Sequence, residues 1–340
     1  MTSAWSSNAS GAAVGTQAAR LLVSIVNYRT PDLTIDCLRS LAAEVRALGR
    51  THVVVTDNAS GDDSVERVRD AIRENDWGSW VSLLPLATNG GFSSGNNAAI
   101  APALESKDPP PPDYFLLLNP DTWVHAGALS ALVEFMDANP RVGIAGSRLE
   151  DADGTLQHSR YRFHSLLSEL ESGLRLGVVT KLLRSRIVAP PLVLAAHRAD
   201  WVAGASMIVR RGVFEDIGLL DAEYFLYFEE VDFCLNARRA GWTCWYVPAS
   251  RVVHLVGRST GFTSRSGDRM RRPQYWFESR RRYFEKNHGS LYAFGAAAAW
   301  SVGFALWRVR RVLQRKPDRD PPHMLWDFLR FSLGRKCGGR

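Results

Sequence analysis

The feature that most constrains this chain is a repeated order of short apolar segments, each followed by a helical pattern. The apolar segments cover residues 21–28, 51–60, 80–87 and 114–119. The helical patterns that follow them cover residues 31–41, 64–74, 98–104 and 126–139. Short apolar runs rich in β-branched residues are typical of buried strands, and alternating helices are typical of right-handed crossovers. We therefore expect an α/β fold with a doubly wound, mostly parallel sheet flanked by helices.

Polar residues stand at or just after the carboxyl end of each predicted strand. They are Asn27, Asp57, Asn89 with Gly90 and Gly91, and Asp121. In an open sheet of parallel strands these ends meet at one edge, and ligands bind there. The sequence therefore predicts a binding site at this edge.

Two of these segments also have ordinary structural explanations. Asp57 could accept from a pyrimidine imide or a ribose hydroxyl, or it could cap the helix at 64–74. The segment at 89–97, NGGFSSGNN, could present the amides of a helix N-terminus to a phosphate, or it could be a plain loop. Its spacing is not G-x-G-x-x-G, so the dinucleotide fingerprint is missing.

The turn Asn119, Pro120 and Asp121 ends the fourth strand in a carboxylate. Asn-Pro favours tight turns with no chemistry implied. Asp121 could also ligate a divalent cation that bridges two phosphates, because Mg²⁺ and Mn²⁺ prefer oxygen ligands. His254, at the end of the last predicted strand, could add a nitrogen ligand or could be a packed core residue.

The second half predicts strands at 142–149, 201–211 and 243–255, and a helix that contains FEEVDF, residues 228–233. Glu229 and Glu230 lie in the first turn of that helix, where acids are ordinary partners of the helix dipole. The aromatic residues just before them would also provide a partly apolar setting. Such a setting raises a carboxylate pKa toward that of a general base.

Composition excludes several classes of protein. Hydrophobic content of 46% and charged content of 23% indicate a globular chain. Four scattered cysteines without a C-x-x-C pair favour neither a disulfide framework nor a cysteine metal site, which suits a reducing cytoplasm. Residues 1–19 are small and polar, and we interpret them as a disordered leader rather than a signal peptide.

The net charge of +7 is concentrated between residues 258 and 336. This basic region indicates either an anionic partner or a solvated basic face. Within it, residues 291–307 form an apolar run that could lie on a membrane surface, pack on the domain or span a bilayer. Trp300 and Trp307 beside Arg308, Arg310 and Arg311 suit an anionic membrane interface. Nucleic acid is not expected, because these side chains do not lie on a polar sheet face.

Seven segments taken in order resemble family 2 glycosyltransferases of the GT-A fold, especially bacterial rhamnosyltransferase-like members. They are VSIVNYRTPDLTIDCLRSL, VVVTDNASGDDS, ATNGGFSSGNNAAI, LLLNPDT, WVAGASMIVRR, FLYFEEVDFCLNARRAGW and VVHLVGRS. The resemblance covers residues 20–260 and implies a nucleotide-binding half at 20–125 and an acceptor and catalytic half at 126–260. Residues 261–340 would form a basic helical C-terminal region.

The resemblance also implies roles for individual residues. Asp57 would bind the nucleotide base within a nucleotide-sugar site made of Asn27, Asp57, Asn58, Asn89, Gly91, Asn96, Asn119 and Asp121. Asp121 keeps the metal-binding carboxylate of a D-x-D motif whose first Asp is Asn119 here, and His254 would complete the shell of Mg²⁺ or Mn²⁺. Glu229 and Glu230 match a Glu-Asp pair whose second member is the catalytic base, so Glu230 is the expected base and Glu229 the alternative. Trp201, Gly204 and Ala205 would shape the acceptor side.

The implied activity is inverting transfer of a sugar to a glycan or a polyprenyl-diphosphate-linked acceptor in cell-surface polysaccharide synthesis. The donor would be a nucleotide-diphosphate sugar, with dTDP-rhamnose favoured and a UDP-sugar possible. The protein would be cytoplasmic and peripheral at the inner face of the cell membrane, held by its C-terminal tail. The alternatives are a nicotinamide-dependent oxidoreductase and a catalytically inactive sugar-binding relative.

Overall fold

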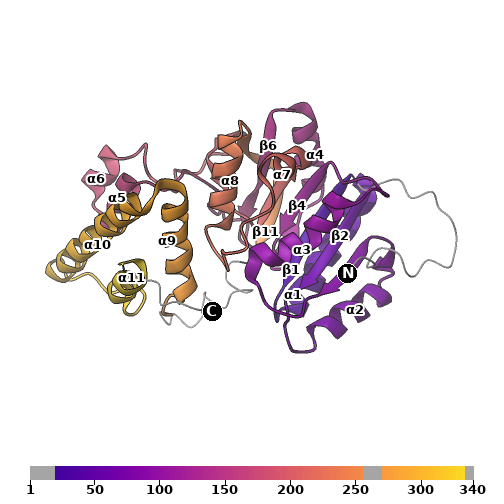
Figure 1. Cartoon of the computed structure of the whole chain (residues 1–340), viewed down its shortest axis with the longest axis horizontal. Helices are drawn as coiled ribbons and strands as arrows, with labels where there is room; N and C mark the ends of the chain where they lie inside the picture. The colour runs from indigo at the N-terminus through magenta and orange to yellow at the C-terminus, as the bar shows by residue number, and fades with distance from the viewer. Residues whose placement is uncertain (1–19, 256–269, 334–340) are drawn as a thin grey trace.

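The computed structural model describes residues 20–255 and 270–333. The predicted leader at 1–19 and the predicted boundary between residues 260 and 261 lie outside these ranges. The described chain forms a large mixed sheet covered by helices, with a lobe of helices at one end of the molecule (Figure 1).

The first half folds as the alternating pattern predicts. Its elements are β1 (Leu21–Asn27), α1 (Pro31–Leu48), β2 (Thr51–Asp57), α2 (Ser64–Glu74), η1 (Trp77–Ser79), β3 (Val81–Pro85), α3 (Gly91–Glu105) and β4 (Tyr114–Leu118). The strands lie in the order β3-β2-β1-β4, and each adjacent pair is parallel. Their carboxyl ends therefore meet at one edge, as expected.

The second half makes the sheet mixed. Its elements up to residue 254, apart from those between 151 and 200, are β5 (Thr122–Val124), α4 (Ala128–Ala138), β6 (Val142–Glu150), β9 (Trp201–Val202), β10 (Ser206–Arg210), α7 (Arg211–Ile217), α8 (Glu229–Arg239) and β11 (Thr243–His254). β10 is antiparallel to both β4 and β6, whereas β6 and β11 are parallel. The sequence pattern could not reveal these directions, because an apolar run looks the same whichever way the strand runs.

Two short strands that pair with β11 were not predicted. β5 pairs antiparallel with the end of β11, and β8 (His197–Ala199) pairs antiparallel with its start. The predicted strand at 201–211 is divided into β9 and β10, with Gly204 between them. β9 leaves the main sheet and pairs with β7 (Arg160–Tyr161).

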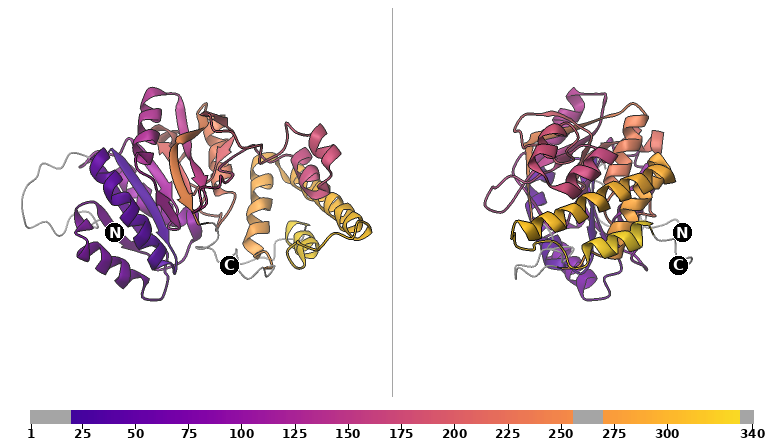
Figure 2. Two further views of the ribbon diagram at one scale, coloured as in Figure 1. Left: turned by 180° about the vertical axis from the view of Figure 1, so that it is seen from behind. Right: turned by 90° about the vertical axis from the view of Figure 1, so that its left-hand side faces the viewer.

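Two apolar layers cover the two faces of the sheet. Alternate strand residues such as Leu21, Val23 and Ile25 pack with α1, α2 and α4 on one face. The intervening residues, such as Leu22 and Phe115, pack with α3, α7 and α8 on the other. The helices that cover the sheet can be seen from two further sides in Figure 2. This alternation follows from the period of two in a strand, and it places α3 and α8 on the same face.

Residues 150–197, in which the sequence pattern predicted no elements, hold two further helices. These are α5 (Leu166–Leu174) and α6 (Gly177–Leu182). α5 packs against α10 (Ser290–Leu313), and their closest approach is at Gly173 and Gly303. A Cβ added at Gly173 would lie 2.6 Å from the Trp300 carbonyl oxygen, so a larger residue cannot be fitted there without a shift. We call α5, α6, α9 (Gln274–His288), α10 and α11 (Met324–Leu333) the helical lobe.

The lobe uses much of its basic charge internally. Arg280 forms a buried ion pair with Glu169 of α5 (2.6 Å), and Arg271 pairs with Asp327 of α11 (2.5 Å). Trp300 was expected at a membrane interface, but it is buried and stacks on Phe328 with ring centroids 4.0 Å apart. The expectation for Trp300 is therefore wrong, because this face of α10 packs inside the lobe.

Candidate active site

Asp57, at the end of β2, has its carboxylate oxygens hydrogen-bonded within the protein. The Asn27 amide of β1 donates to Oδ2 at 2.7 Å. The Ser60 hydroxyl donates to the same oxygen at 2.6 Å, and the Ser60 N–H donates to Oδ1 at 3.0 Å. These bonds hold the carboxylate in one orientation. The helix-cap alternative for Asp57 is wrong, because the N-cap position of α2 is Asp63.

Asn58 and Asn89 extend this network toward α3. The Asn58 amide donates to Asn89 Oδ1 at 2.8 Å and to the Gly91 carbonyl at 3.0 Å, and the Gly91 N–H donates to Asn89 Oδ1 at 3.0 Å. Asn96, one turn further along α3, is fully buried. Its amide nitrogen donates to the Phe92 carbonyl at 2.9 Å. The four asparagines and Asp57 thus lie along one edge of the sheet.

Gly91 allows a close approach, but within the chain rather than to a ligand. Its φ is +83°, and a Cβ there would lie 2.0 Å from the Phe225 carbonyl oxygen. The N–H of Phe92 donates to that same oxygen at 2.8 Å. Residues 91–97 of the glycine-rich segment are therefore helical and begin α3, so the plain-loop alternative is wrong for them, and the start of α3 holds the loop that precedes Glu229 and Glu230.

Asn119, Asp121 and His254 come together through β5. β5 pairs with the end of β11 and sets His254 opposite Thr122, next to Asp121. His254 Nε2 lies 3.6 Å from Asp121 Oδ1 and 3.4 Å from Asn119 Nδ2. Burial lowers the pKa of His254, although the charge of Asp121 opposes this, and the neutral imidazole is the form that binds metals.

This donor set fits a divalent cation that is also held by a substrate. One carboxylate and one neutral imidazole are too few to enclose a metal. The described residues contain no group of three or more His, Cys, Asp or Glu side chains that could hold one. Mg²⁺ and Mn²⁺ commonly take one or two protein ligands together with substrate phosphates. Asp121 and His254 would hold the cation, and a diphosphate would supply the remaining oxygens.

Glu229 and Glu230 begin α8 in a setting that disfavours charge. Burial and the charge of Glu230 raise the pKa of Glu229 well above its ordinary value. Burial raises the pKa of Glu230 to about 7. In each residue Oε2 is buried and has no hydrogen-bond partner among the described residues. Val231, Cys234 and Leu235 form the inner face of this helix and are buried.

The loop before these acids has a strained backbone. Tyr227 and Phe228 both have positive φ, at 70° and 68°. Such conformations cost about 1–3 kcal/mol each and persist when the surroundings fix them. Here α9 does so: its Tyr275 contacts the ring of Tyr227, and its Tyr283 packs on Phe228 with centroids 5.6 Å apart.

Of the three predicted acceptor-side residues, Gly204 lies next to Glu230, Ala205 lies next to Asn119, and Trp201 packs on Tyr161. A Cβ added at Gly204 would meet the Phe92 ring at 3.4 Å and the Glu230 Cβ at 3.9 Å, so this glycine leaves space beside Glu230. The Ala205 carbonyl accepts from the Asn119 N–H at 3.0 Å. Trp201 stacks on Tyr161 with centroids 4.2 Å apart.

Sequence reasoning missed three residues of this region: Ser60, Phe92 and Tyr161. Ser60 stands three residues after Asp57, a spacing at which turn hydroxyls and carboxylates often bond, so a signal was present. Phe92 lay inside the glycine-rich segment and Tyr161 in a stretch without periodicity. Burial and the charge of Glu230 raise the pKa of Tyr161 to about 12, which places this phenol within the electrostatic reach of the acid.

Comparison with known proteins identifies the family of this chain. The family model for glycosyltransferase-like family 2 matches residues 19–298. The chain therefore belongs to this family. The nicotinamide-dependent oxidoreductase alternative is set aside.

Two curated relatives are rhamnosyltransferases. An N-acetylglucosaminyl-diphospho-decaprenol L-rhamnosyltransferase of Mycobacterium tuberculosis is 31% identical over 193 residues, covering 53% of this chain and 61% of the relative. The rhamnosyltransferase WbbL of Escherichia coli K12 is 30% identical over 167 residues, covering 49% of this chain and 61% of the relative. The matches thus span about three fifths of the length of each relative.

Solved structures show the same fold. A mannosyltransferase of Pyrobaculum calidifontis, solved with GDP-Man and Mn²⁺, matches with a TM-score of 0.52 at 15% identity, covering 94% of this chain and 86% of that one. Staphylococcus aureus TarS 1–349 matches with a TM-score of 0.50 at 14% identity, covering 92% and 81%. Together with the mixed sheet, these likenesses establish a GT-A fold.

Proposed function

We propose that this protein is an inverting glycosyltransferase that moves a hexose, with rhamnose favoured, from a nucleotide-diphosphate donor to a lipid-linked glycan. The observation that carries the proposal is the position of Glu230. The pKa of Glu230 is about 7, and the absence of a side chain at Gly204 leaves room beside it. Gly204 is adjacent in sequence to Ala205, whose carbonyl accepts from the Asn119 N–H. A base and a candidate metal–diphosphate site thus lie on neighbouring parts of one edge.

The residues would divide the reaction as follows. Asp57, Asn27, Asn58 and Asn89 would hold the nucleotide, because a carboxylate fixed by three hydrogen bonds is already oriented to accept from a base or a ribose. Glu230 would take the proton of the acceptor hydroxyl as that oxygen attacks the anomeric carbon. Glu229, more deeply buried, would stay protonated and limit repulsion at its neighbour.

Asp121 and His254 would hold Mg²⁺ or Mn²⁺. The bound cation would supply positive charge next to the leaving diphosphate. We expect Asp121→Ala to weaken donor binding in the presence of metal and to leave metal-free binding unchanged. Calorimetric titration of donor with and without EDTA measures both. Equal metal dependence in the variant and the parent would contradict the role of Asp121.

The donor and the stereochemistry can be tested together. dTDP-rhamnose is preferred by likeness to the curated rhamnosyltransferases, and UDP-sugars are the comparison. Purified protein should consume one of them in the presence of a diphosphate-linked acceptor, and proton NMR should show that the configuration at the anomeric carbon is inverted. Retention would refute a single displacement. Donor binding without turnover or hydrolysis would favour a catalytically inactive relative.

We also propose that the protein sits on the inner face of the cell membrane through α10. One side of α10 packs on α5, α9 and α11, and the opposite side carries a continuous exposed apolar stripe at helical spacing. The stripe consists of Leu291, Phe294, Val302, Leu306, Val309 and Leu313. Among the described residues, α10 is the helix with enough length and apolar composition to cross a membrane. Its packed inner side favours contact with the surface over a span.

Vesicle binding tests this stripe without cutting the chain. Leu306→Gln, Val309→Gln and Leu313→Gln together should reduce flotation with anionic vesicles by about tenfold or more, since each removes a buried apolar contact with lipid. The matched control changes the exposed Leu192, Val193 and Leu194 to Gln. Equal loss in both variants, or no loss in either, would contradict a specific role for α10.

A further inference from the structure

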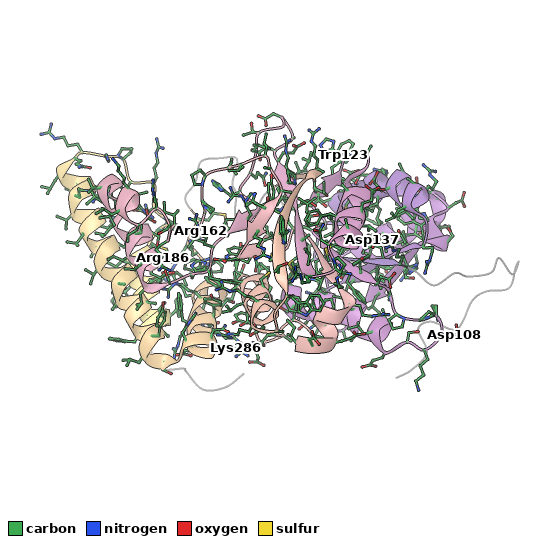
Figure 3. The ribbon with its side chains drawn as sticks, turned by 90° about the horizontal axis from the view of Figure 1, so that it is seen from above. Asp108, Trp123, Asp137, Arg162, Arg186 and Lys286 are labelled. Carbon is green, nitrogen blue, oxygen red and sulfur yellow. The ribbon has the colours of Figure 1, made fainter. Side chains whose placement is uncertain are left out.

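A cavity lies beside the candidate active site, and Tyr161 is part of its lining. It has a volume of about 460 Å³ and opens between the end of α8, the start of β11, and strands β7 and β8. We call it the arginine pocket. Arg162 is seen between the helical lobe and the central sheet in Figure 3. The arginine, histidine and aspartate side chains that line it are Arg160, Arg162, His197, Arg198, Asp200 and Arg238.

The arginine pocket has a positive charge that its single carboxylate does not balance. Asp200 pairs with Arg238 at 3.2 Å, and its other oxygen accepts from the Phe163 N–H at 3.0 Å. Among the described residues, the Arg162 side chain donates to the backbone carbonyls of Arg184 at 3.0 Å and Ile187 at 3.2 Å. Three arginines of the pocket, Arg160, Arg162 and Arg198, thus have no carboxylate partner within the described residues.

Arg160 shows this most clearly, because it is only 7% exposed. One end of its guanidinium donates to the Pro191 carbonyl, while Nε has no hydrogen-bond partner among residues 20–255 and 270–333. Burial lowers the pKa of Arg160, Tyr246 opposes this shift, and the charge of Arg162 adds to it. The Tyr246 ring, whose centroid lies 6.0 Å from the guanidinium carbon, carries no full counter-charge. A buried cation without a counter-charge is unfavourable, and such groups are usually paired. An anion bound in the pocket would supply the counter-charge that the described side chains do not provide.

We propose that the arginine pocket binds a phosphate or diphosphate group carried by the acceptor. Guanidinium groups match the geometry of phosphate oxygens, and several of them around one cavity select a multivalent oxyanion over a carboxylate. The cavity is larger than a single phosphate, so the anion would be part of a larger molecule. The phosphate chemistry stands on the pocket alone, and its assignment to the acceptor rests on the proposed function.

The position of the pocket supports an acceptor rather than a donor. Tyr161 lines the pocket, stacks on Trp201, and lies within the electrostatic reach of Glu230. Glu230 and Arg238 stand at opposite ends of α8, a separation of about 12 Å along the helix axis. An acceptor could therefore place a sugar hydroxyl at Glu230 and its phosphate in the pocket. The nucleotide residues Asp57 and Asn89 belong to the other side of the site.

Pyrophosphate binding tests the pocket directly. The full chain is titrated calorimetrically with inorganic pyrophosphate in EDTA, so that metal-dependent binding near Asp121 does not contribute. Arg198→Glu is the main variant, because Arg198 is exposed and its loss should not disturb the fold. We expect the affinity to fall about tenfold or more. Arg69→Glu on α2 is the matched control, with the same charge change on an exposed arginine, and should leave affinity unchanged.

Unchanged affinity in Arg198→Glu, or an equal loss in Arg69→Glu, would overturn the proposal. The source of the phosphate is tested by turnover. With a diphosphate-linked acceptor, Arg198→Glu should raise the acceptor KM about tenfold while the donor KM and kcat stay constant. An acceptor analogue without phosphate should show no such change. An unaltered acceptor KM would refute the acceptor as the source and indicate a free anion.

These outcomes are separable from the proposed function. If no nucleotide sugar is turned over but pyrophosphate binding still depends on Arg198, the glycosyltransferase proposal fails and the phosphate site stands. If sugar is transferred but Arg198→Glu changes neither pyrophosphate affinity nor the acceptor KM, the phosphate-site proposal fails and the glycosyltransferase proposal stands.

Discussion

Two carboxylate sites lie at the same edge of this sheet, and they differ in whether the carboxylate oxygens accept hydrogen bonds from the protein. Asp57 accepts three hydrogen bonds from Asn27 and Ser60 at 2.6–3.0 Å. Glu229 and Glu230 each keep a buried oxygen without a partner, and burial raises the pKa of both. A carboxylate whose oxygens accept hydrogen bonds is fixed in orientation, which suits binding. An unsatisfied one exchanges a proton near neutral pH, which suits catalysis.

The largest expected effect separates the two acids of α8. Glu230→Gln should reduce kcat by about 10²–10⁴-fold, because general base catalysis contributes that much, while donor affinity is retained. Steady-state rates and donor titration measure the two quantities. Glu229→Gln is the matched comparison and should have the smaller effect on kcat. The reverse order would assign the base to Glu229.

The same type of change at the nucleotide end should act on binding. Asp57→Asn replaces an acceptor by a group that faces two donors, Asn27 and Ser60, and leaves them poorly paired. We expect a loss of about 1–3 kcal/mol in the free energy of unfolding and a weaker donor affinity, with kcat at saturation nearly unchanged. Chemical denaturation and donor titration check this. A drop in kcat alone would remove the distinction between the two sites.

The pH dependence of turnover should report the acid pair. A base must be deprotonated, so with a pKa of about 7 for Glu230 the rate should rise about tenfold per pH unit below 7 and level off above it. The inflection belongs to the pair, because the two acids interact. In Glu230→Gln this inflection should disappear from the residual rate. Its persistence would point to another titrating group.

The smallest expected effect is that of Glu229→Gln on stability. Its sign is opposite to the effect of Asp57→Asn on stability. The folded pKa of Glu229 lies above its unfolded value, so its contribution to stability is present at low pH and is lost as pH rises through the folded pKa. Glu229→Gln should therefore raise Tm by about 2–4 °C at pH values near 8. The gain should vanish below the unfolded pKa of about 4. Calorimetry at both pH values tests this, and a lower Tm near pH 8 would contradict the burial argument.

The sequence was most informative where the pattern is local. Strands 21–27 and 51–57 and the polar residues at their ends follow from apolar runs and turn residues. The pairing of β5 with β11 brings His254 to Asp121 and joins residues about 130 positions apart. β5 itself is only three residues long. Such a pairing has no periodic signal. The glycine at 91 was recognised, but its neighbour, the Phe225 carbonyl, could only be found in three dimensions.

The C-terminal region shows the same limit. Its positive charge was interpreted either as a surface for an anionic partner or as a solvated basic face. Much of it is used in ion pairs with acids far away in sequence, such as Arg280 with Glu169. The exposed apolar stripe of α10 was only partly visible in the sequence, because alanines and glycines on the opposite side of the helix pack against α5.

The docking of α9 has a practical consequence. Lys286 bridges Asp221 and Asp232 at 2.8 and 2.7 Å, and Ser279 donates to the Leu226 carbonyl at 3.0 Å. Lys286 can be located at the junction of lobe and sheet in Figure 3. These contacts hold α9 against residues on both sides of Glu229 and Glu230. A fragment that stops after β11 would therefore lose the contacts that position the candidate base Glu230. Shortened versions made for crystallisation or screening should therefore keep α9, even when solubility argues for removing the rest.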